Sequence, residues 1–190
     1  MSDQFREGNE FEKKLILKTL ESISNDIISY IKENLDQLFL KIPQSNSIFK
    51  YPIIFFIPNQ LIETIHNLQN KTKIKEAGIY LGFIKRGKFY LSIEAAEYFI
   101  AKNLISENDK IYVNEKGTKA ILYGNNLKRE IITKSPKKLY NNKIYFIMNE
   151  FNELLAIGLS KGKKNLNNLK AKQEIVINLI DKGYYLRKKQ

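Results

Sequence analysis

Apolar residues along the first half of the chain change between helical and strand spacing. Over residues 19–34 they recur every three or four positions, which predicts a helix with one buried face. Ile53–Ile57 is a short apolar run between two prolines and predicts a buried strand. Residues 61–68 return to helical spacing, and Asn59 is placed to open this second helix. Residues 1–12 are polar and acidic and are expected to form a flexible tail.

A hairpin and a third helix are predicted next. Gly78–Ile84 and Lys88–Leu91 have the character of strands and are joined by Lys85-Arg86-Gly87. The glycine supplies the positive φ that a tight hairpin turn needs. Ser92 is then expected to cap a helix over Ile93–Lys102.

The second half of the chain changes to short apolar runs separated by turn-prone residues. The runs are Ile111–Val113, Ile131–Ile132, Ile144–Met148, Leu154–Leu159, Ile175–Ile180 and Tyr184–Leu186. Only Lys119–Tyr123 has helical character, and Gly124 is expected to stop that helix. Many short strands at this spacing are typical of a small β-barrel or sandwich. We therefore expect an α+β protein with an N-terminal α/β domain over residues 1–107 and a β-barrel over residues 108–190.

Composition excludes several kinds of chemistry. The chain has 190 residues, no cysteine and a single histidine, His66. The lack of cysteine excludes disulfides, thiolate nucleophiles and Cys-based zinc sites, and a lone histidine in a helical pattern is expected to be a surface or satisfied residue. No apolar run approaches the roughly 20 residues of a membrane helix, and neither a secretory signal nor a phosphate-binding or dinucleotide motif is present. We expect a cytoplasmic protein without catalytic residues, cofactor or metal.

The net charge of +12 is unevenly distributed. Residues 1–107 carry 14 basic and 13 acidic side chains, whereas residues 108–190 carry 18 basic and 7 acidic ones. A general bias toward lysine codons would act on both halves alike. The asymmetry therefore says more about function than the total charge does.

The lysines of the second half lie in stretches with few acids. The stretch 154–173 has no acid and five lysines: Lys161, Lys163, Lys164, Lys170 and Lys172. Two smaller basic groups are Lys134, Lys137 and Lys138, and Arg187, Lys188 and Lys189. Uncompensated lysines attract polyanions such as nucleic acid. A solvated lysine surface is the alternative, whereas an anionic membrane is disfavoured because no lysine-rich amphipathic helix is evident.

Three sequence blocks occur in an order that resembles a known family. They are Leu81–Ile93 (LGFIKRGKFYLSI), Ile121–Asn125 (ILYGN) and Ile175–Arg187 (IVINLIDKGYYLR). Their order resembles the archaeal branch of the ribosome-biogenesis family known from its eukaryotic member, nuclear import protein seven. The similarity extends over residues 19–187 and so covers nearly the whole chain.

The resemblance implies a particular pair of domains and a cellular role. The N-terminal domain would carry helices on an antiparallel sheet, and the C-terminal domain would be a PUA domain, a pseudo-β-barrel that binds RNA in many unrelated proteins. The implied role is maturation of the large ribosomal subunit, with a link to the RNA-degrading exosome. The basic, strand-rich second half agrees independently with a PUA domain.

The resemblance also implies which residues contact RNA. Gly124 matches the glycine that follows the PUA helix, where RNA often approaches because no side chain intervenes; a plain helix C-cap explains this glycine equally well. The family's basic face corresponds to the loop after Gly158 and the last strand. The residues expected to bind RNA are Gly124, Lys161, Lys163, Lys164, Lys170, Lys172 and Arg187.

Two positions depart from the family pattern, which places glycine at both. Asn142 can still adopt the left-handed turn conformation. Ala156 cannot do so cheaply, so its backbone is expected to be extended.

We therefore expect a non-catalytic RNA-binding factor in large-subunit biogenesis. Lysine–phosphate contacts would supply affinity, and stacking would favour single-stranded A/U-rich pre-rRNA. The nearly neutral N-terminal domain would bind exosome or ribosome-assembly proteins, with no membrane involved. One alternative is a small RNA-modifying or RNA-processing enzyme with an unrecognised active site in residues 1–107. Another is a structural ribosomal protein, which the nearly neutral half argues against.

Overall fold

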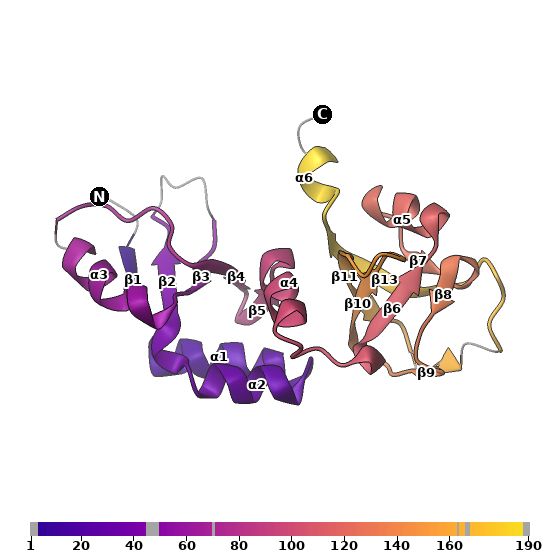
Figure 1. Cartoon of the computed structure of the whole chain (residues 1–190), viewed down its shortest axis with the longest axis horizontal. Coiled ribbons are helices and arrows are strands. Elements are labelled where there is room, and N and C mark those ends of the chain that lie inside the picture. Colours follow the sequence, from indigo (N-terminus) through magenta and orange to yellow (C-terminus); the bar gives the residue numbers. More distant parts are fainter. Residues whose placement is uncertain (1–3, 45–49, 70, 163, 166–167, 188–190) are drawn as a thin grey trace. The chain divides into compact units, whose positions relative to one another are not determined.

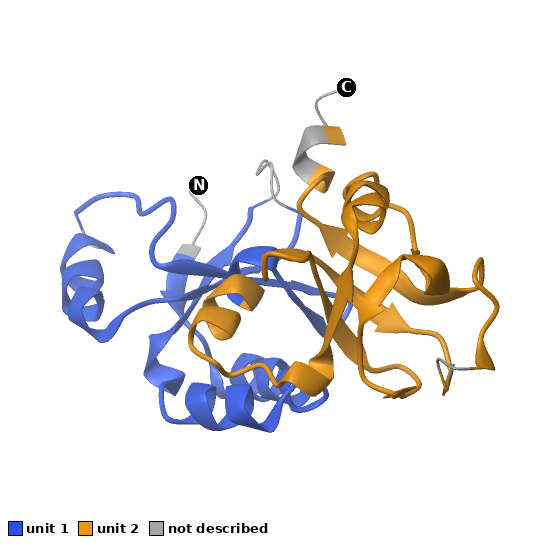
Figure 2. Cartoon of the chain, turned by 45° about the vertical axis from the view of Figure 1, so that its right-hand side comes forward, with its two compact units in different colours: residues 1–95 blue, residues 96–190 orange. Residues whose placement is uncertain are grey.

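The chain divides into two structural units. The computed structural model describes residues 4–44, 50–69, 71–162, 164–165 and 168–187. Unit 1 comprises residues 1–95 and unit 2 comprises residues 96–190 (Figure 2). None of the helices in the described ranges is long and apolar enough to cross a membrane.

Unit 1 is built on a five-stranded antiparallel sheet (Figure 1). The strands lie in the sheet in chain order, so every connection joins two neighbours. They are β1 (Gln4–Glu7), β2 (Leu38–Ile42), β3 (Ile53–Phe56), β4 (Ile79–Lys85) and β5 (Lys88–Leu91). β5 is therefore an edge strand of this sheet.

Helices pack on both faces of this sheet. α1 (Glu10–Glu21) and α2 (Asn25–Lys32) run along one face (Figure 1). On that face, Phe56 of β3 lies with its ring centroid 5.8 Å from that of Tyr30 in α2. Its neighbour Phe55 points to the opposite face and packs in a cluster with residues of α3 (Asn59–Gln69). A strand that is buried on both faces has a continuous apolar run rather than alternation, which explains the predicted IIFFI segment.

The predicted helix over residues 19–34 is two helices, and it begins earlier than expected. Asn9 caps α1, and its side chain and that of Glu12 exchange hydrogen bonds with each other's backbone N–H groups, which is a capping box. Ser24 then starts α2 by accepting a hydrogen bond from the N–H of Asp26. The apolar spacing continues across this break, so periodicity alone does not reveal it.

Residues 4–7 form β1, where the sequence predicts a flexible tail. The strand pairs with β2 along its whole length. Phe5 explains the attachment, because its ring lies 5.7 Å from that of Phe39 and 5.8 Å from that of Phe55. A four-residue segment has too little periodicity to predict this long-range packing from sequence.

The predicted hairpin and third helix are confirmed. Arg86 and Gly87 join β4 to β5 and both have positive φ, 49° and 68°, as a type I′ turn requires. Ser92 caps α4 (Ile93–Ala101) by accepting a hydrogen bond of 3.0 Å from the N–H of Ala95.

Unit 2 contains a six-stranded, nearly closed barrel-like sheet in the order β7-β13-β11-β10-β6-β8. Its strands are β6 (Lys110–Val113), β7 (Leu127–Lys128), β8 (Ile132–Lys134), β10 (Ile144–Met148), β11 (Leu154–Ser160) and β13 (Glu174–Asp181). The edge strands β7 and β8 are separated by only three residues, the 3₁₀ turn Arg129–Ile131. Three residues span roughly 10 Å at most, so the sheet must curve until its two edges nearly meet.

The short helices of unit 2 lie at its N-terminal and C-terminal parts. η2 (Glu107–Asp109) precedes β6, and α5 (Glu115–Leu122) is capped by Asn114, which accepts a hydrogen bond from the N–H of Gly117. The prediction of a strand at Tyr184–Leu186 is wrong, because α6 (Tyr184–Arg187) is one helical turn. The N–H of Arg187 donates to the carbonyl of Gly183, which closes this turn.

The two departures from the family pattern behave as expected. Asn142 has φ of 55° and is thus in the left-handed region. Ala156 lies within β11 and is paired with Asp181, so its backbone is extended.

Two glycines of the hairpin provide a matched test of backbone strain. Gly82 has φ of 148°, and a Cβ there would collide with the carbonyl oxygen of Tyr90, whereas Gly87 has positive φ but nothing within 4 Å. Gly87→Ala should lower the free energy of unfolding by about 1 kcal/mol through strain alone. Gly82→Ala should lower it by at least about 2 kcal/mol more, because strain and overlap add. Urea unfolding followed by circular dichroism measures both; equal losses would contradict the assigned collision.

Candidate nucleic-acid interface

The predicted residues Gly124 and Arg187 are brought together at the end of α5. Gly124 has φ of 85°, and a Cβ there would lie 3.1 Å from Nη2 of Arg187. The N–H of Gly124 donates to the carbonyl of Ile121, and the N–H of Asn125 donates to that of Ala120. These two bonds form a Schellman motif, so Gly124 is a helix C-cap.

The Arg187 guanidinium is satisfied within the protein. Nη1 and Nη2 each donate to one oxygen of Asp181, both at 2.9 Å, and Nη1 also donates to the carbonyl of Leu122. The Asp181 side chain is only 4% exposed, and the ion pair with Arg187 offsets part of the free-energy cost of burying the carboxylate. The hydrogen bond to Asp181 raises the pKa of Arg187. The residue therefore joins α6 to α5, and its contact with RNA stays a prediction.

Asparagine side chains extend this junction along β13. Asn178 donates from Nδ2 to the carbonyl of Ile121 and to Oδ2 of Asp181. The N–H of Asn178 donates in turn to Oδ1 of Asn126, whose Nδ2 donates to Glu174. Neither Asn178 nor Asp181 is among the residues predicted from the sequence to bind RNA. Both lie within the block Ile175–Arg187, but nothing in their spacing indicates that they meet the end of α5.

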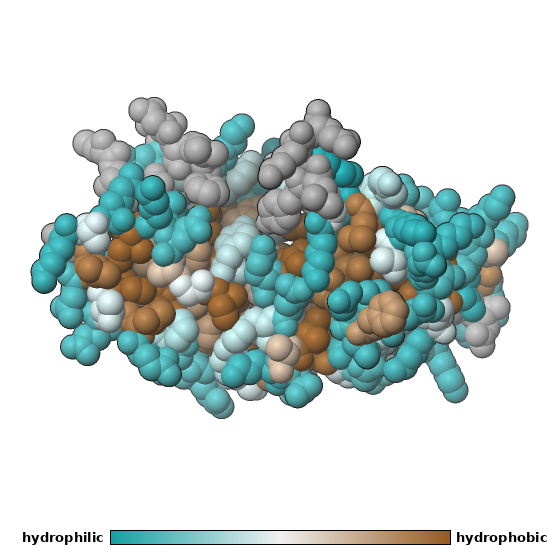
Figure 3. Space-filling model, turned by 45° about the horizontal axis from the view of Figure 1, so that its top comes forward, coloured by the Kyte–Doolittle hydropathy of each residue, from teal (hydrophilic) through white to brown (hydrophobic). Residues whose placement is uncertain are grey.

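A group of exposed lysines lies at another part of unit 2. β9 (Lys138–Leu139) and β12 (Lys164–Asn165) form a two-stranded antiparallel sheet in which Lys138 pairs with Asn165. This pairing brings the segment that contains Lys137 and Lys138 beside the segment that contains Lys161 and Lys164, although the two segments are more than 20 residues apart in the sequence. Figure 3 shows that hydrophilic side chains cover most of the end of the unit that carries β8 and β9.

The loop between β11 and β13 is fixed at both ends. The N–H of Lys161 donates to the carbonyl of Ile175, which closes the loop. The N–H groups of Arg129 and Glu130 donate to the carbonyls of Gln173 and Ala171. Leu169 packs against the core. Lys170 and Lys172 therefore stand exposed on an anchored backbone.

We call five exposed residues the lysine surface: Lys137, Lys138, Lys161, Lys170 and Lys172. No ion pair with an acid in the described part of the chain is present at any of these five. Of the other predicted residues, Lys164 lies in β12, and its side chain is outside the described residues, as is Lys163 entirely. Tyr140, which is 54% exposed, follows β9 directly and adds an aromatic ring beside these charges.

Other lysines of unit 2 form ion pairs with acids. Lys110 and Lys134 lie 2.7 and 3.0 Å from the Glu107 carboxylate, and Lys143 lies 2.5 Å from Asp109. Hydrogen bonds from Lys110 and Lys134 lower the pKa of the Glu107 carboxyl to about 2. Lys134 thus differs from its sequence neighbours Lys137 and Lys138, and the pairing separates it from the lysine surface.

No group of three or more His, Asp or Glu side chains within the described ranges is placed to hold a metal ion. His66 of unit 1 lies with Nε2 2.9 Å from the Glu7 carboxylate and its ring against Phe39, as a satisfied surface histidine does.

The curved sheet of unit 2, with α5 beside it, defines a PUA domain. Residues 109–190 match the family model described as the UPF0113 PUA domain. The domain boundary between residues 107 and 108 stays a prediction; the two compact units divide between residues 95 and 96. A protein of Archaeoglobus fulgidus described as a UPF0113 protein is 31% identical over 112 residues, which cover 58% of this chain and 61% of that protein.

Two solved archaeal structures are similar to nearly the whole chain. A conserved PUA domain protein from Thermoplasma acidophilum has a TM-score of 0.58 at 12% identity and covers 98% of this chain and 99% of its own. A PUA domain from Aeropyrum pernix K1, determined as a tartrate complex, has a TM-score of 0.62 at 14% identity and covers 97% and 89%. At these identities the likeness concerns the fold.

The ion pairs of Glu107 with Lys110 and Lys134 predict a pH dependence of stability. The pKa of Glu107 falls from 4.5 to about 2 on folding, so its contribution is complete above pH 4.5 and is lost as the pH falls toward 2. Glu107→Gln should flatten this acid limb of the stability profile, measured as urea midpoints at several pH values. Lys134→Gln, which removes one of the two donors, should flatten it in part. A Glu107→Gln profile parallel to that of the parent would contradict the assignment.

Proposed function

We propose that the chain is a non-catalytic RNA-binding protein whose PUA domain binds single-stranded RNA through the lysine surface. The observation that carries the proposal is the β9–β12 pairing. It places the strand that contains Lys138 beside the segment that begins at Lys161, and backbone hydrogen bonds hold that segment at its ends. Ammonium groups without acidic partners release counterions when they meet phosphates, which drives binding. Tyr140 supplies a ring on which an unpaired base can stack.

The preference for single strands follows from the same groups. In duplex RNA the bases are hidden in the helix, so an exposed ring gains nothing from them. Stacking tolerates every base, and flexible A/U-rich segments expose their bases most readily. We therefore propose A/U-rich single strands as the ligand class.

The hollow of unit 1 favours binding over catalysis. It has a volume of about 590 Å³ and lies between α1 and the β4–β5 turn. It is lined by Phe11, Lys14, Leu15, Lys18, Thr19, Ser22, Gly87 and Lys88. These side chains include no carboxylate or imidazole that could act as a general base, so this hollow offers no acid–base pair.

A matched pair of triple variants tests the lysine surface. Lys161→Gln/Lys170→Gln/Lys172→Gln should weaken binding of an oligo(U) about tenfold in fluorescence anisotropy. It should also make the slope of log K against log salt shallower by about 2, since each phosphate contact contributes roughly 0.7.

The control removes the same charge elsewhere in the same unit. Lys116→Gln/Lys119→Gln/Lys182→Gln alters exposed lysines outside the lysine surface and should change both quantities little. Equal losses in the two triple variants would mean that total charge, rather than this surface, determines binding.

We further propose that the cellular ligand is precursor RNA of the large ribosomal subunit, and that exosome or assembly proteins bind the N-terminal unit. The support is the sequence resemblance together with the PUA match. Crosslinking in cells followed by sequencing should recover mainly large-subunit precursor RNA. Recovery of a scattered set of messenger RNAs would instead favour a role with the exosome alone.

A further inference from the structure

Three aromatic rings form a stacked column on unit 1. The Phe83 and Tyr90 rings are 5.1 Å apart between centroids with an interplanar angle of 8°, because these residues are direct partners in the β4–β5 pairing. Tyr51 stacks on the other side of Phe83 at 6.1 Å and 28°. We call Tyr51, Phe83 and Tyr90 the aromatic column.

The aromatic column is open at its Tyr90 end. Tyr90 is 42% exposed, and it lies in β5, the edge strand of the sheet. Further along the same sheet, rings such as Phe39 and Phe55 are buried with α3. The aromatic column therefore consists of rings on this sheet that α3 does not cover.

Positive charge is concentrated beside these rings. The hairpin over residues 79–91 contains Lys85, Arg86 and Lys88 and no acid, although unit 1 as a whole has 13 basic and 11 acidic residues. Lys85 Nζ lies 5.0 Å from the centroid of Tyr51. Arg86 and Lys88 are exposed at the turn, and neither is ion-paired with an acid in the described ranges.

We propose that the aromatic column is a second site for single-stranded RNA, in which a base stacks on Tyr90 and adjacent phosphates contact Lys85 and Arg86. The inference deepens the proposed function and rests on it, since RNA is the ligand in both. A flat open ring beside unpaired cations is the combination with which sequence-tolerant single-strand sites bind bases and backbone together. An RNA long enough to reach both units gains affinity from this second contact.

An acidic protein segment is the competing occupant, and the charge alone would suit it equally. The stacked geometry favours RNA, because Tyr90 continues a nearly parallel column to which a planar base adds another layer. An acidic side chain has no such plane. The experiment below therefore includes an acidic peptide.

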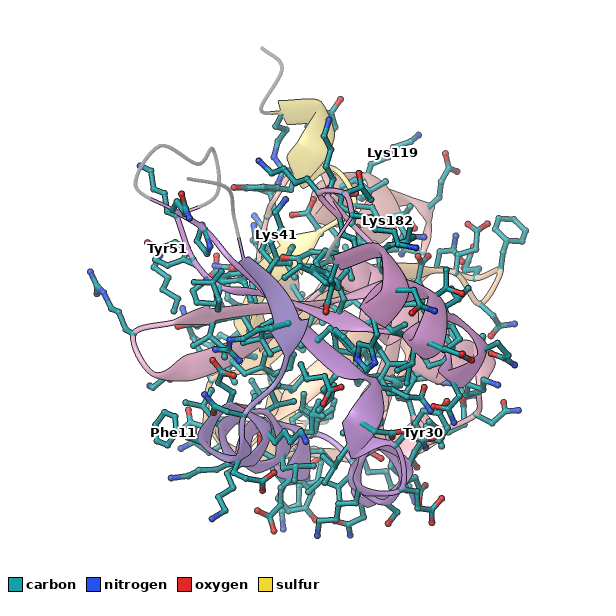
Figure 4. All side chains as sticks on the ribbon, turned by 90° about the vertical axis from the view of Figure 1, so that its left-hand side faces the viewer. Phe11, Tyr30, Lys41, Tyr51, Lys119 and Lys182 are labelled. Carbon is teal, nitrogen blue, oxygen red and sulfur yellow. The ribbon has the colours of Figure 1, made fainter. Side chains whose placement is uncertain are left out.

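The absence of tryptophan from the chain makes a direct probe available. Tyr90→Trp in the full chain introduces a single indole at the open end of the column. Titration with a 12-nucleotide oligo(U) should quench its fluorescence saturably, because a stacked base quenches indole. Phe11→Trp is the control: Phe11 is 74% exposed on α1, and Figure 4 shows it on the other side of the hairpin from Tyr51. Its fluorescence should change little.

A loss-of-ring variant completes the test. Tyr90→Leu keeps an apolar side chain on the edge strand and removes the ring, and it should weaken oligo(U) binding about fivefold in anisotropy with an unchanged circular dichroism spectrum. Oligo(U) binding in anisotropy without quenching of the Tyr90→Trp protein would overturn the second site and leave the proposed function standing. Failure of the parent chain to bind oligo(U) at all would overturn both. Quenching by a polyglutamate peptide but not by oligo(U) would assign the column to a protein partner and overturn the proposal.

Discussion

The three-residue turn Arg129–Ile131 is the constraint on which the rest of unit 2 depends. It joins the two edge strands of the six-stranded sheet, so its length determines how far the sheet must curve. The backbone N–H groups of the same turn hold the carbonyls of Ala171 and Gln173. Closure of the barrel and placement of the lysine-bearing loop are therefore achieved by the same few backbone groups. Side chains on that loop can vary without loss of the anchor, since the anchor is made by main-chain atoms.

The basic side chains of the chain divide into two roles. Arg187 is bound to the buried carboxylate of Asp181, and several lysines are paired with acids on η2 or α5. These groups hold elements together. The members of the lysine surface have no acidic partners in the described ranges, and neither do Arg86 and Lys88 of the β4–β5 turn. Their charge therefore remains available to a ligand. Net charge counted from composition does not distinguish the two roles, whereas pairing geometry does.

The strands and helices with several residues of clear periodicity were predictable from sequence. β3, the β4–β5 hairpin, α4, β10, β11 and β13 all lie where apolar runs and turn residues indicated. β7, β9 and β12 have two residues each, too few for any period, and they exist because tertiary pairing selects them. The apolar run Tyr184–Leu186 predicts a strand, but these residues belong to the helical turn α6, whose last residue, Arg187, is bound to Asp181 and Leu122. The family resemblance implied that Gly124 and Arg187 both contact RNA, but it did not indicate that the two residues meet. The pairing of Lys134 with Glu107 had no signal in the spacing.

The pairing of lysines with acids has a consequence for how the protein approaches a polyanion. Lys110, Lys119, Lys134 and Lys143 are paired with three acids, Glu107, Asp109 and Glu115, so most of their charge is compensated locally. The uncompensated charge of the PUA domain near β9 and β12 then gives the domain an electric dipole. In the field of an RNA strand such a dipole experiences a torque that turns the lysine surface toward the RNA before contact. In the proposed binding of RNA, the acids of η2 and α5 thus contribute to the rate of productive encounter, although they bind no phosphate themselves.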